Sequence, residues 1–166
     1  MSQMISADYL ERIFETFSNL LGCHVEYTNL EGKSVACSSF IKQRRSLTPS
    51  RFPLGVTHQI SRNPSPIILD RRYSALVPPC VSCPRASSCD ILLEIASPII
   101  NSGETLGVLA FAAYNHVEAE WLASNVEFFI QINNSLAQII AGLFGTRIAI
   151  SGSPKGSGEK SPFGEL

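Results

Sequence analysis

Three cysteines within ten residues are the side chains in this sequence best suited to chemistry. Cys80, Cys83 and Cys89 have the spacing C-x2-C-x5-C, among prolines and serines rather than in an apolar run. A C-x2-C turn can place two thiolates on one metal ion or cluster, and a third thiolate shortly after it can reach the same centre. The spacing therefore predicts a metal or iron–sulfur centre that still needs a fourth ligand.

Cys37 and Cys23 are the candidates for that fourth ligand, and His24 or His58 are substitutes. Cys37 is preferred, because it falls on a predicted strand and can point into a pocket above a sheet, whereas Cys23 follows a predicted helix. A single C-x2-C pair suits an iron–sulfur cluster slightly better than zinc, whose structural sites favour two such pairs. The alternative is that these cysteines are small buried hydrophobic side chains.

The composition is that of a globular domain with no electrostatic preference for nucleic acid or membrane. The chain has 166 residues, 45% hydrophobic and 16% charged, with a net charge of -1. No segment is long and apolar enough for a membrane span, and the start lacks a signal-peptide pattern. These features predict a cytoplasmic location. In a reducing cytosol, five cysteines favour metal binding or redox sensing over a disulfide framework.

The first half of the chain predicts a helix followed by a β-hairpin. Two alternating segments, residues 24–28 and 34–38, flank a glycine-containing turn and predict paired strands. Residues 40–79 contain repeated prolines and predict loops with one short helix. The N-terminal helix spans residues 6–21 and is ended by Gly22, with an apolar stripe formed by Leu10, Ile13, Phe17 and Leu20.

The second half predicts another hairpin and a long closing helix. Residues 92–100 and 105–114 are strands around a turn, with Pro98 marking an edge or bulge. A helix over residues 117–144 is ended by Gly145. Its heptad seam predicts a homodimer, with helix 6–21 assisting; the seam consists of Leu122, Val126, Phe129, Asn133, Leu136, Ile140 and Leu143. The alternative is that this stripe packs on the chain's own sheet.

These elements predict an α+β fold, an antiparallel sheet with its N- and C-terminal helices on one face. We expect residues 1–150 to form the domain. Residues 151–166 are rich in glycine, serine and charge and predict a flexible linker to a downstream module.

This order of elements resembles the GAF/PAS-type sensory domains at the N-terminus of bacterial enhancer-binding, sigma-54-dependent transcriptional activators. The resemblance is carried by the cysteines of residues 80–89, by Ile95-Ala96-Ser97-Pro98-Ile99-Ile100, and by the Gly103–Phe111 hairpin. The cysteines are also similar to those of PocR-type sensor domains. The resemblance implies a domain that precedes an ATPase module and a DNA-binding module, which the given residues do not include.

The resemblance implies a signal-sensing regulatory domain of a transcriptional regulator. The signal is redox or gas state at a centre held by Cys37, Cys80, Cys83 and Cys89, with Cys23 as the other candidate ligand, or a small-molecule effector. The output passes through helix 117–144. A structural zinc-stapled dimerisation module and a thiol redox enzyme are the alternatives. We expect no enzyme activity, because no catalytic constellation is present in the sequence.

Overall fold

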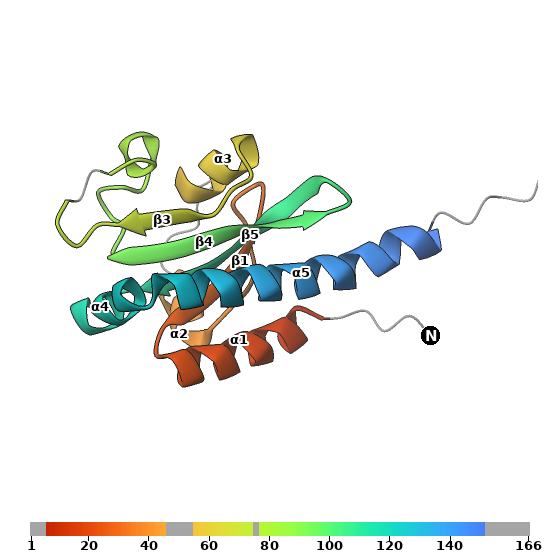
Figure 1. Ribbon diagram of the computed structural model, residues 1–166, viewed down its shortest axis with the longest axis horizontal. Helices are drawn as coiled ribbons and strands as arrows, with labels where there is room; N and C mark the ends of the chain where they lie inside the picture. Colours follow the sequence, from red (N-terminus) through yellow and green to blue (C-terminus); the bar gives the residue numbers. More distant parts are fainter. Residues whose placement is uncertain (1–5, 46–54, 75–76, 152–166) are drawn as a thin grey trace, which may run out of the picture.

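The computed structural model describes residues 6–45, 55–74 and 77–151, and places a five-stranded antiparallel sheet at the centre (Figure 1). The strand order is β2-β1-β5-β4-β3, so the two hairpins lie side by side. The elements, in chain order, are α1 (Ala7–Leu21), β1 (His24–Asn29), β2 (Ser34–Cys37), α2 (Ser39–Arg45), α3 (Gly55–Arg62), β3 (Ile67–Asp70), the short 3-10 helix η1 (Cys80–Ser82), β4 (Leu93–Asn101), β5 (Glu104–Ala113), α4 (His116–Ser124) and α5 (Val126–Ser151).

Helix α1 confirms the predicted N-terminal helix, with one change in its buried face. Ser6 is the N-cap, and Gly22 ends the helix in the left-handed conformation at φ 64°. Leu10 and Phe14 are the buried residues of the helix, whereas Leu20, predicted to belong to the stripe, is 77% exposed. The apolar face is therefore rotated toward Phe14.

Alternation along β5 separates the two faces of the sheet. Leu109, Phe111 and Ala113 belong to one hydrophobic cluster, whereas Val108 and Ala110 belong to another. At Gly107 the neighbouring strand comes very close, since a Cβ there would lie 2.3 Å from the carbonyl oxygen of Thr28. Glycine is needed at this position for β1 and β5 to pair.

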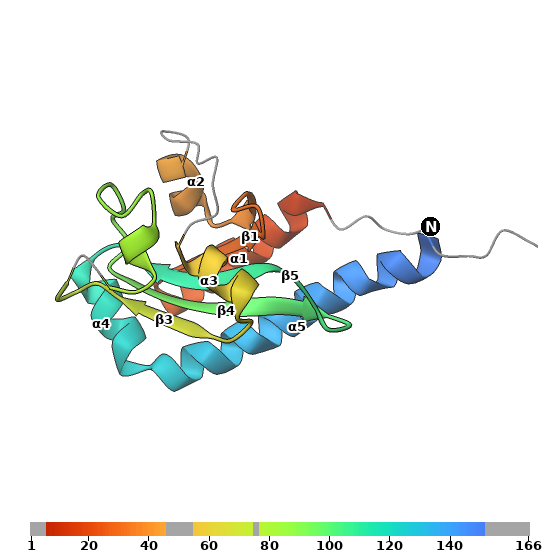
Figure 2. The same ribbon diagram turned by 90° about the horizontal axis from the view of Figure 1, so that it is seen from above.

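The two faces carry different helices, which confirms the predicted α+β arrangement. Helices α1 and α5 cover one face, and α3 lies over the other (Figures 1 and 2). The larger cluster joins α1, α4 and α5 to the sheet, and the smaller one joins α3, Leu69 and Cys80 to it. Pro98 lies beyond Ala96, where the pairing of β4 with β3 ends, and next to an irregularity in the pairing with β5 between Ile99 and Ile100.

The closing helix differs from the prediction. Residues 117–144 form two helices, because Asn125 caps α4 and its side-chain amide donates to the carbonyl of Trp121 at 2.8 Å. Gly145 does not end α5, which continues to Ser151. A single glycine costs a helix only about 1 kcal/mol, which the rest of a long helix can offset.

The prediction for the insert, residues 40–79, needs correction, and most of the predicted linker lies outside the described residues. The described residues of this insert, 40–45, 55–74 and 77–79, form two helices, α2 and α3, and an edge strand, β3, where the sequence predicted one short helix. The predicted linker lies outside the described residues, apart from Ser151. None of the helices in the described part of the chain is long and apolar enough to cross a membrane.

The predicted dimer seam lies mostly inside the chain's own core. Asn133 is fully buried, and its amide donates to the backbone carbonyls of Ile95 and Leu109, both at 3.0 Å. It therefore ties α5 to the central hairpin instead of fixing the register of two helices. Four apolar members of the seam are buried with it: Leu122, Phe129, Leu136 and Ile140.

Candidate functional site

A pocket of about 270 Å³ opens between the sheet and the segments that cover its second face. Its floor contains Ala110 and Ala112 of β5, flanked by Glu26 of β1 and Glu94 of β4. Glu26 pairs in register with Ala110 and Glu94 with Ala112, so both carboxylates project from the same face as the alanine methyl groups. Two small side chains on the central strand leave the space that larger residues would fill.

Helices α2 and α3 form one wall of this pocket. Ile41, Val56 and Thr57 line it, and the Thr57 hydroxyl lies 3.3 Å from the Thr28 hydroxyl. Gly55 allows close packing at the start of α3, because a Cβ there would lie 2.6 Å from the Pro79 carbonyl oxygen. The wall is therefore mostly apolar, with a hydroxyl pair at the floor.

The cysteine segment, residues 80–91, forms the other wall and brings three of the predicted ligands together. Cys80, Cys83 and Cys89 all line the pocket. Burial is the largest cause raising the pKa of Cys80 and of Cys89, which favours the neutral thiol. The structure thus places these three cysteines along one pocket.

Cys37 and Cys23 lie elsewhere. Cys37 is buried and pairs in register with Glu26, so it lies on the pocket face of the sheet, but it does not line the pocket. Cys23 belongs to the core cluster of α1 and α5 on the opposite face. Desolvation there raises the pKa of Cys23 to about 12. The sheet therefore separates Cys23 from the other cysteines.

As placed, the cysteines do not form a metal site. Within residues 6–45, 55–74 and 77–151, no three His, Cys, Asp or Glu side chains are arranged to hold a metal ion. A thiol must lose its proton to bind a metal, and burial opposes this at Cys80 and Cys89. Without a metal, burial therefore keeps Cys80 and Cys89 as neutral thiols in the pocket wall.

Arg71 holds the cysteine segment in place through hydrogen bonds to its backbone. Its guanidinium donates to the carbonyls of Ala86 at 3.0 Å and Cys89 at 2.9 Å, and to that of Ile91 at 3.3 Å. These contacts satisfy backbone acceptors of a segment that has little regular structure. Arg71 therefore supports the segment that forms this wall.

The pocket edge carries a charged and aromatic group. Arg44 of α2 forms an ion pair with Asp90, and both side chains are about half exposed, at 46% and 53%. The guanidinium also lies over the rings of Phe40 at 4.6 Å and Tyr114 at 5.2 Å. Such stacking holds an arginine in place while leaving its donors available.

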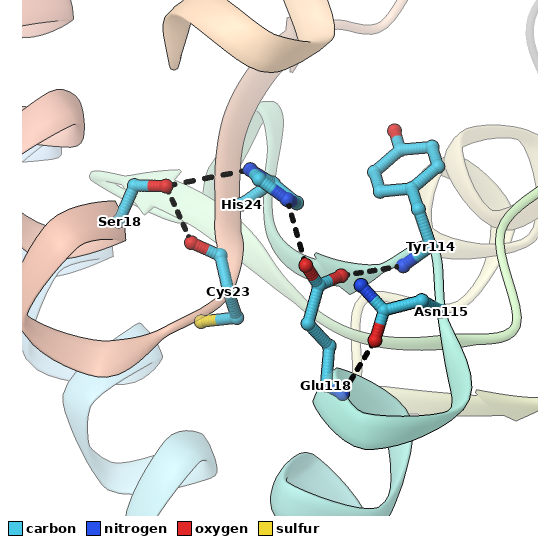
Figure 3. A network of polar contacts seen from close by, with 6 residues as sticks. All are labelled: Ser18, Cys23, His24, Tyr114, Asn115 and Glu118. Atoms are coloured by element: carbon cyan, nitrogen blue, oxygen red, sulfur yellow. Dashed lines mark hydrogen bonds and ion pairs between the residues drawn. The ribbon is translucent and has the colours of Figure 1, made fainter.

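His24 belongs to a polar network next to this edge (Figure 3). Its ring stacks on Phe40 at 4.0 Å, and its Nε2 lies 3.3 Å from Glu118 Oε1. The other oxygen of Glu118 accepts from the Tyr114 backbone N–H at 2.9 Å. Glu118 N–H in turn donates to the Asn115 side chain, which caps α4. The network therefore connects the pocket edge to the start of α4.

Sequence reasoning missed this network and the polar floor, although both leave a signal. Asn115 and Glu118 have the spacing of a helix capping box. His24, Glu26 and Thr28 alternate along one strand and so project from one face, which is typical of a polar site on a central strand. His58, the other substitute ligand, is exposed on α3 and does not line the pocket.

Solved structures with the same arrangement are GAF domains. The nlh2 GAF domain of A. aeolicus, in an inactive state, aligns with a TM-score of 0.61 at 15% identity, over 87% of this chain and 88% of that one. The GAF domain of a phosphoenolpyruvate-protein phosphotransferase (ptsP) from Coxiella burnetii aligns with a TM-score of 0.54 at 18% identity, over 90% and 88%. The chain has a GAF-type fold.

A third GAF structure, the cofactor-binding GAF domain of the nutrient sensor CodY from Clostridium difficile, aligns with a TM-score of 0.51 at 14% identity over 84% of each chain. No protein-family model matches the chain, and no curated protein is similar to it in sequence. At these identities the comparisons establish the GAF-type fold, and the function is argued from the pocket.

Proposed function

We propose that this GAF-type domain is a signal-sensing regulatory domain, without enzyme activity, whose signal is a small molecule bound in the pocket. The observation that carries the proposal is the pocket itself: mostly apolar walls, a few charged groups, and a floor made of alanines on the central strand. Binding sites for small molecules are concave and mostly apolar, with few polar groups. A volume of about 270 Å³ favours a metabolite smaller than a nucleotide or a chromophore.

The proposed output runs from the pocket edge to the closing helices. Tyr114 lines the pocket, and its backbone N–H binds the Glu118 side chain of α4. A ligand that moves Tyr114 or Phe40 would therefore change the His24–Glu118 contact and the position of α4. Such a change acts as a shift between two packings of the domain. By the resemblance, the proposed receivers are the ATPase and DNA-binding modules of a cytoplasmic transcriptional regulator.

The test of this function is ligand binding with the pocket filled. Ala112→Leu extends a side chain from the floor into the pocket, and Asn134→Leu adds one of similar size to the exposed face of α5 as a control. Thermal unfolding should identify metabolites that raise the midpoint of the wild type and of Asn134→Leu. The same metabolites should leave the unfolding midpoint of Ala112→Leu unchanged, although this variant is folded. A metabolite that stabilises all three proteins equally binds elsewhere and would contradict the proposal.

A homodimer remains part of the proposal, through a different face of the helices. A groove between α1 and α5 is lined by Phe17, Phe128, Ile132 and Ile139, and Phe128 and Ile139 are 45% and 58% exposed. A second copy of the chain would cover these side chains. Because Ile139 points away from the core, Ile139→Glu should give a folded monomer in sedimentation, whereas a wild-type monomer at tens of micromolar would refute the dimer.

A cysteine-bound centre is the second candidate, favoured by the convergence of Cys80, Cys83 and Cys89 on one pocket. Soft thiolate ligands suit zinc or an iron–sulfur cluster. Protein prepared without oxygen should then contain stoichiometric zinc or iron, lost in Cys83→Ser and retained in Cys23→Ser. Metal-free, colourless wild-type protein would end this candidate and leave the thiols as pocket wall.

A further inference from the structure

The charged groups of the pocket are separated by sign. The two walls together cover the floor and are called the cover. The cover contributes two arginines, Arg44 from α2 and Arg85 from the cysteine segment, whereas the floor contributes two carboxylates, Glu26 and Glu94. The remaining charged lining residue, Asp90, is also on the cover and is already paired with Arg44. Between these groups the walls are apolar or carry hydroxyls and thiols. A ligand in this pocket therefore meets carboxylates on one side and guanidinium groups on the other.

The floor is suited to a cationic group. Glu26 exposes only 8% of its surface and lies one strand away from Ala110, and Glu94 lies one strand away on the other side of β5. A carboxylate in a site that excludes most water attracts an ammonium group far more strongly than one at the surface. Glu26, Glu94 and Arg85 also hold contacts within the protein, so a ligand shares them.

The cover is suited to a carboxylate. The Arg44 guanidinium is held over Phe40 and Tyr114, and its partner Asp90 is a half-exposed carboxylate on the cysteine segment. An ion pair between half-exposed side chains contributes little to stability, so another carboxylate can replace Asp90 at little cost. Asp90 thus occupies the position that the carboxylate of a ligand would take.

We propose that the ligand of this pocket is a small zwitterion of the amino-acid type, with its ammonium group at Glu26 and its carboxylate at Arg44 in exchange for Asp90. This inference rests on the proposed sensing function and adds the chemical class of the signal. It also names the first structural change of the signal. When the ligand carboxylate replaces Asp90, the ion pair between α2 and the cysteine segment is lost.

The experiment is calorimetric titration of the full chain with the proteinogenic L-amino acids. Each amino acid that binds is compared with its decarboxylated amine and its deaminated acid. We expect at least one amino acid to bind, and its amine and its acid to bind at least tenfold more weakly, because each lacks one charge-assisted contact. Equal binding of the amine or of the acid would overturn the inference, as would binding of no amino acid.

Two substitutions should act in opposite directions on that binding. Arg44→Gln should weaken it about tenfold or more, whereas Asp90→Asn should strengthen it by about two- to fivefold, because the internal competitor is gone. Arg62→Gln, an exposed change at the end of α3, is the matched control and should leave the affinity unchanged. Weaker binding in Asp90→Asn would contradict the exchange. If Glu26→Gln does not fold, the wild-type comparison of amine, acid and amino acid still decides the role of the floor.

The outcome also separates this inference from the proposed function. If an amine, an acid or a neutral metabolite binds alone and Ala112→Leu abolishes that binding, the pocket senses another chemical class. The sensing function then stands and the zwitterion is refuted. If no metabolite requires the pocket for binding, both the sensing function and the zwitterion inference are refuted.

Discussion

Exchanging the Asn133 amide for a carboxylate tests whether this residue belongs to the monomer core or to a dimer seam. Asn133→Asp keeps the size of the side chain but removes the two N–H bonds to the carbonyls of Ile95 and Leu109. A net 0.5–1.5 kcal/mol for each bond gives a loss of about 1–3 kcal/mol. A buried charge facing carbonyl oxygens raises the total to about 3–5 kcal/mol at pH 7.

The assay is urea unfolding followed by circular dichroism, with Asn134→Asp as the matched control. Asn134 is the next residue on α5 and is exposed, so the same change there should cost less than about 0.5 kcal/mol. With a slope of about 1–3 kcal/mol/M, Asn133→Asp should lower the urea midpoint by about 2 M. Equal midpoints for the two variants would refute the placement of Asn133 in the core.

The loss should depend on pH in a defined direction. Burial raises the pKa of the new Asp above the value of about 3.9 that it has in the unfolded chain. Below about pH 4 both states are protonated and the charge penalty is absent. As pH rises from there toward the folded-state pKa, about 1.4 kcal/mol is lost for each pH unit. A pH-independent difference between the two variants would contradict a buried carboxylate.

Three further predictions concern the sheet, the core thiol and the cysteine segment. Gly107→Ala should destabilise the fold by several kcal/mol in urea unfolding, because its Cβ would overlap Thr28, whereas Gly142→Ala on α5 should be neutral or stabilising by up to about 1 kcal/mol. At pH 8, iodoacetamide should leave Cys23 unmodified in the folded protein and modify it in urea, since its pKa is about 12 and it is buried; alkylation of folded Cys23 at the rate of Cys83 would contradict this. Arg71→Lys should increase proteolysis within residues 80–91, because it loses the fork of bonds to three carbonyls, and Arg62→Lys should not.

Local sequence patterns were sufficient to predict the two hairpins and the first helix. The alternation of residues 24–28 and 105–114 gave both hairpins, and the helical spacing of Leu10 and Phe17 gave α1. Strand β3 escaped prediction because Ile67–Asp70 is short and follows two prolines, and its strand state depends on pairing with β4.

The role of the closing helix could not be decided from sequence. A stripe with Leu136 and Ile140 at heptad spacing looks the same whether it faces a sheet or a second helix. Asn133 was read as a register residue, although its partners are carbonyls of β4 and β5 that are distant in sequence. Contacts of this kind follow from the tertiary fold.

The centre predicted from Cys80, Cys83 and Cys89 stays a prediction. The structure places these three residues along one pocket, and Cys37 on the same face of the sheet. What the thiols share is the wall of a pocket. Its floor depends on Ala110 and Ala112, whose small size carries no chemical signal in a sequence.

The most direct test of the central claim is a methyl NMR titration of alanine-labelled protein with the best-binding amino acid. Ala86, Ala110 and Ala112 line the pocket, whereas Ala113, Ala137 and Ala141 are buried in the cluster on the opposite face of the sheet. A ligand in the pocket should move the first three methyl signals most, in proportion to its binding. In Ala112→Leu protein it should move the two that remain, Ala86 and Ala110, no more than it moves Ala113. Larger shifts at Ala113, Ala137 and Ala141, or no saturable shift at Ala110, would contradict the pocket as the sensing site.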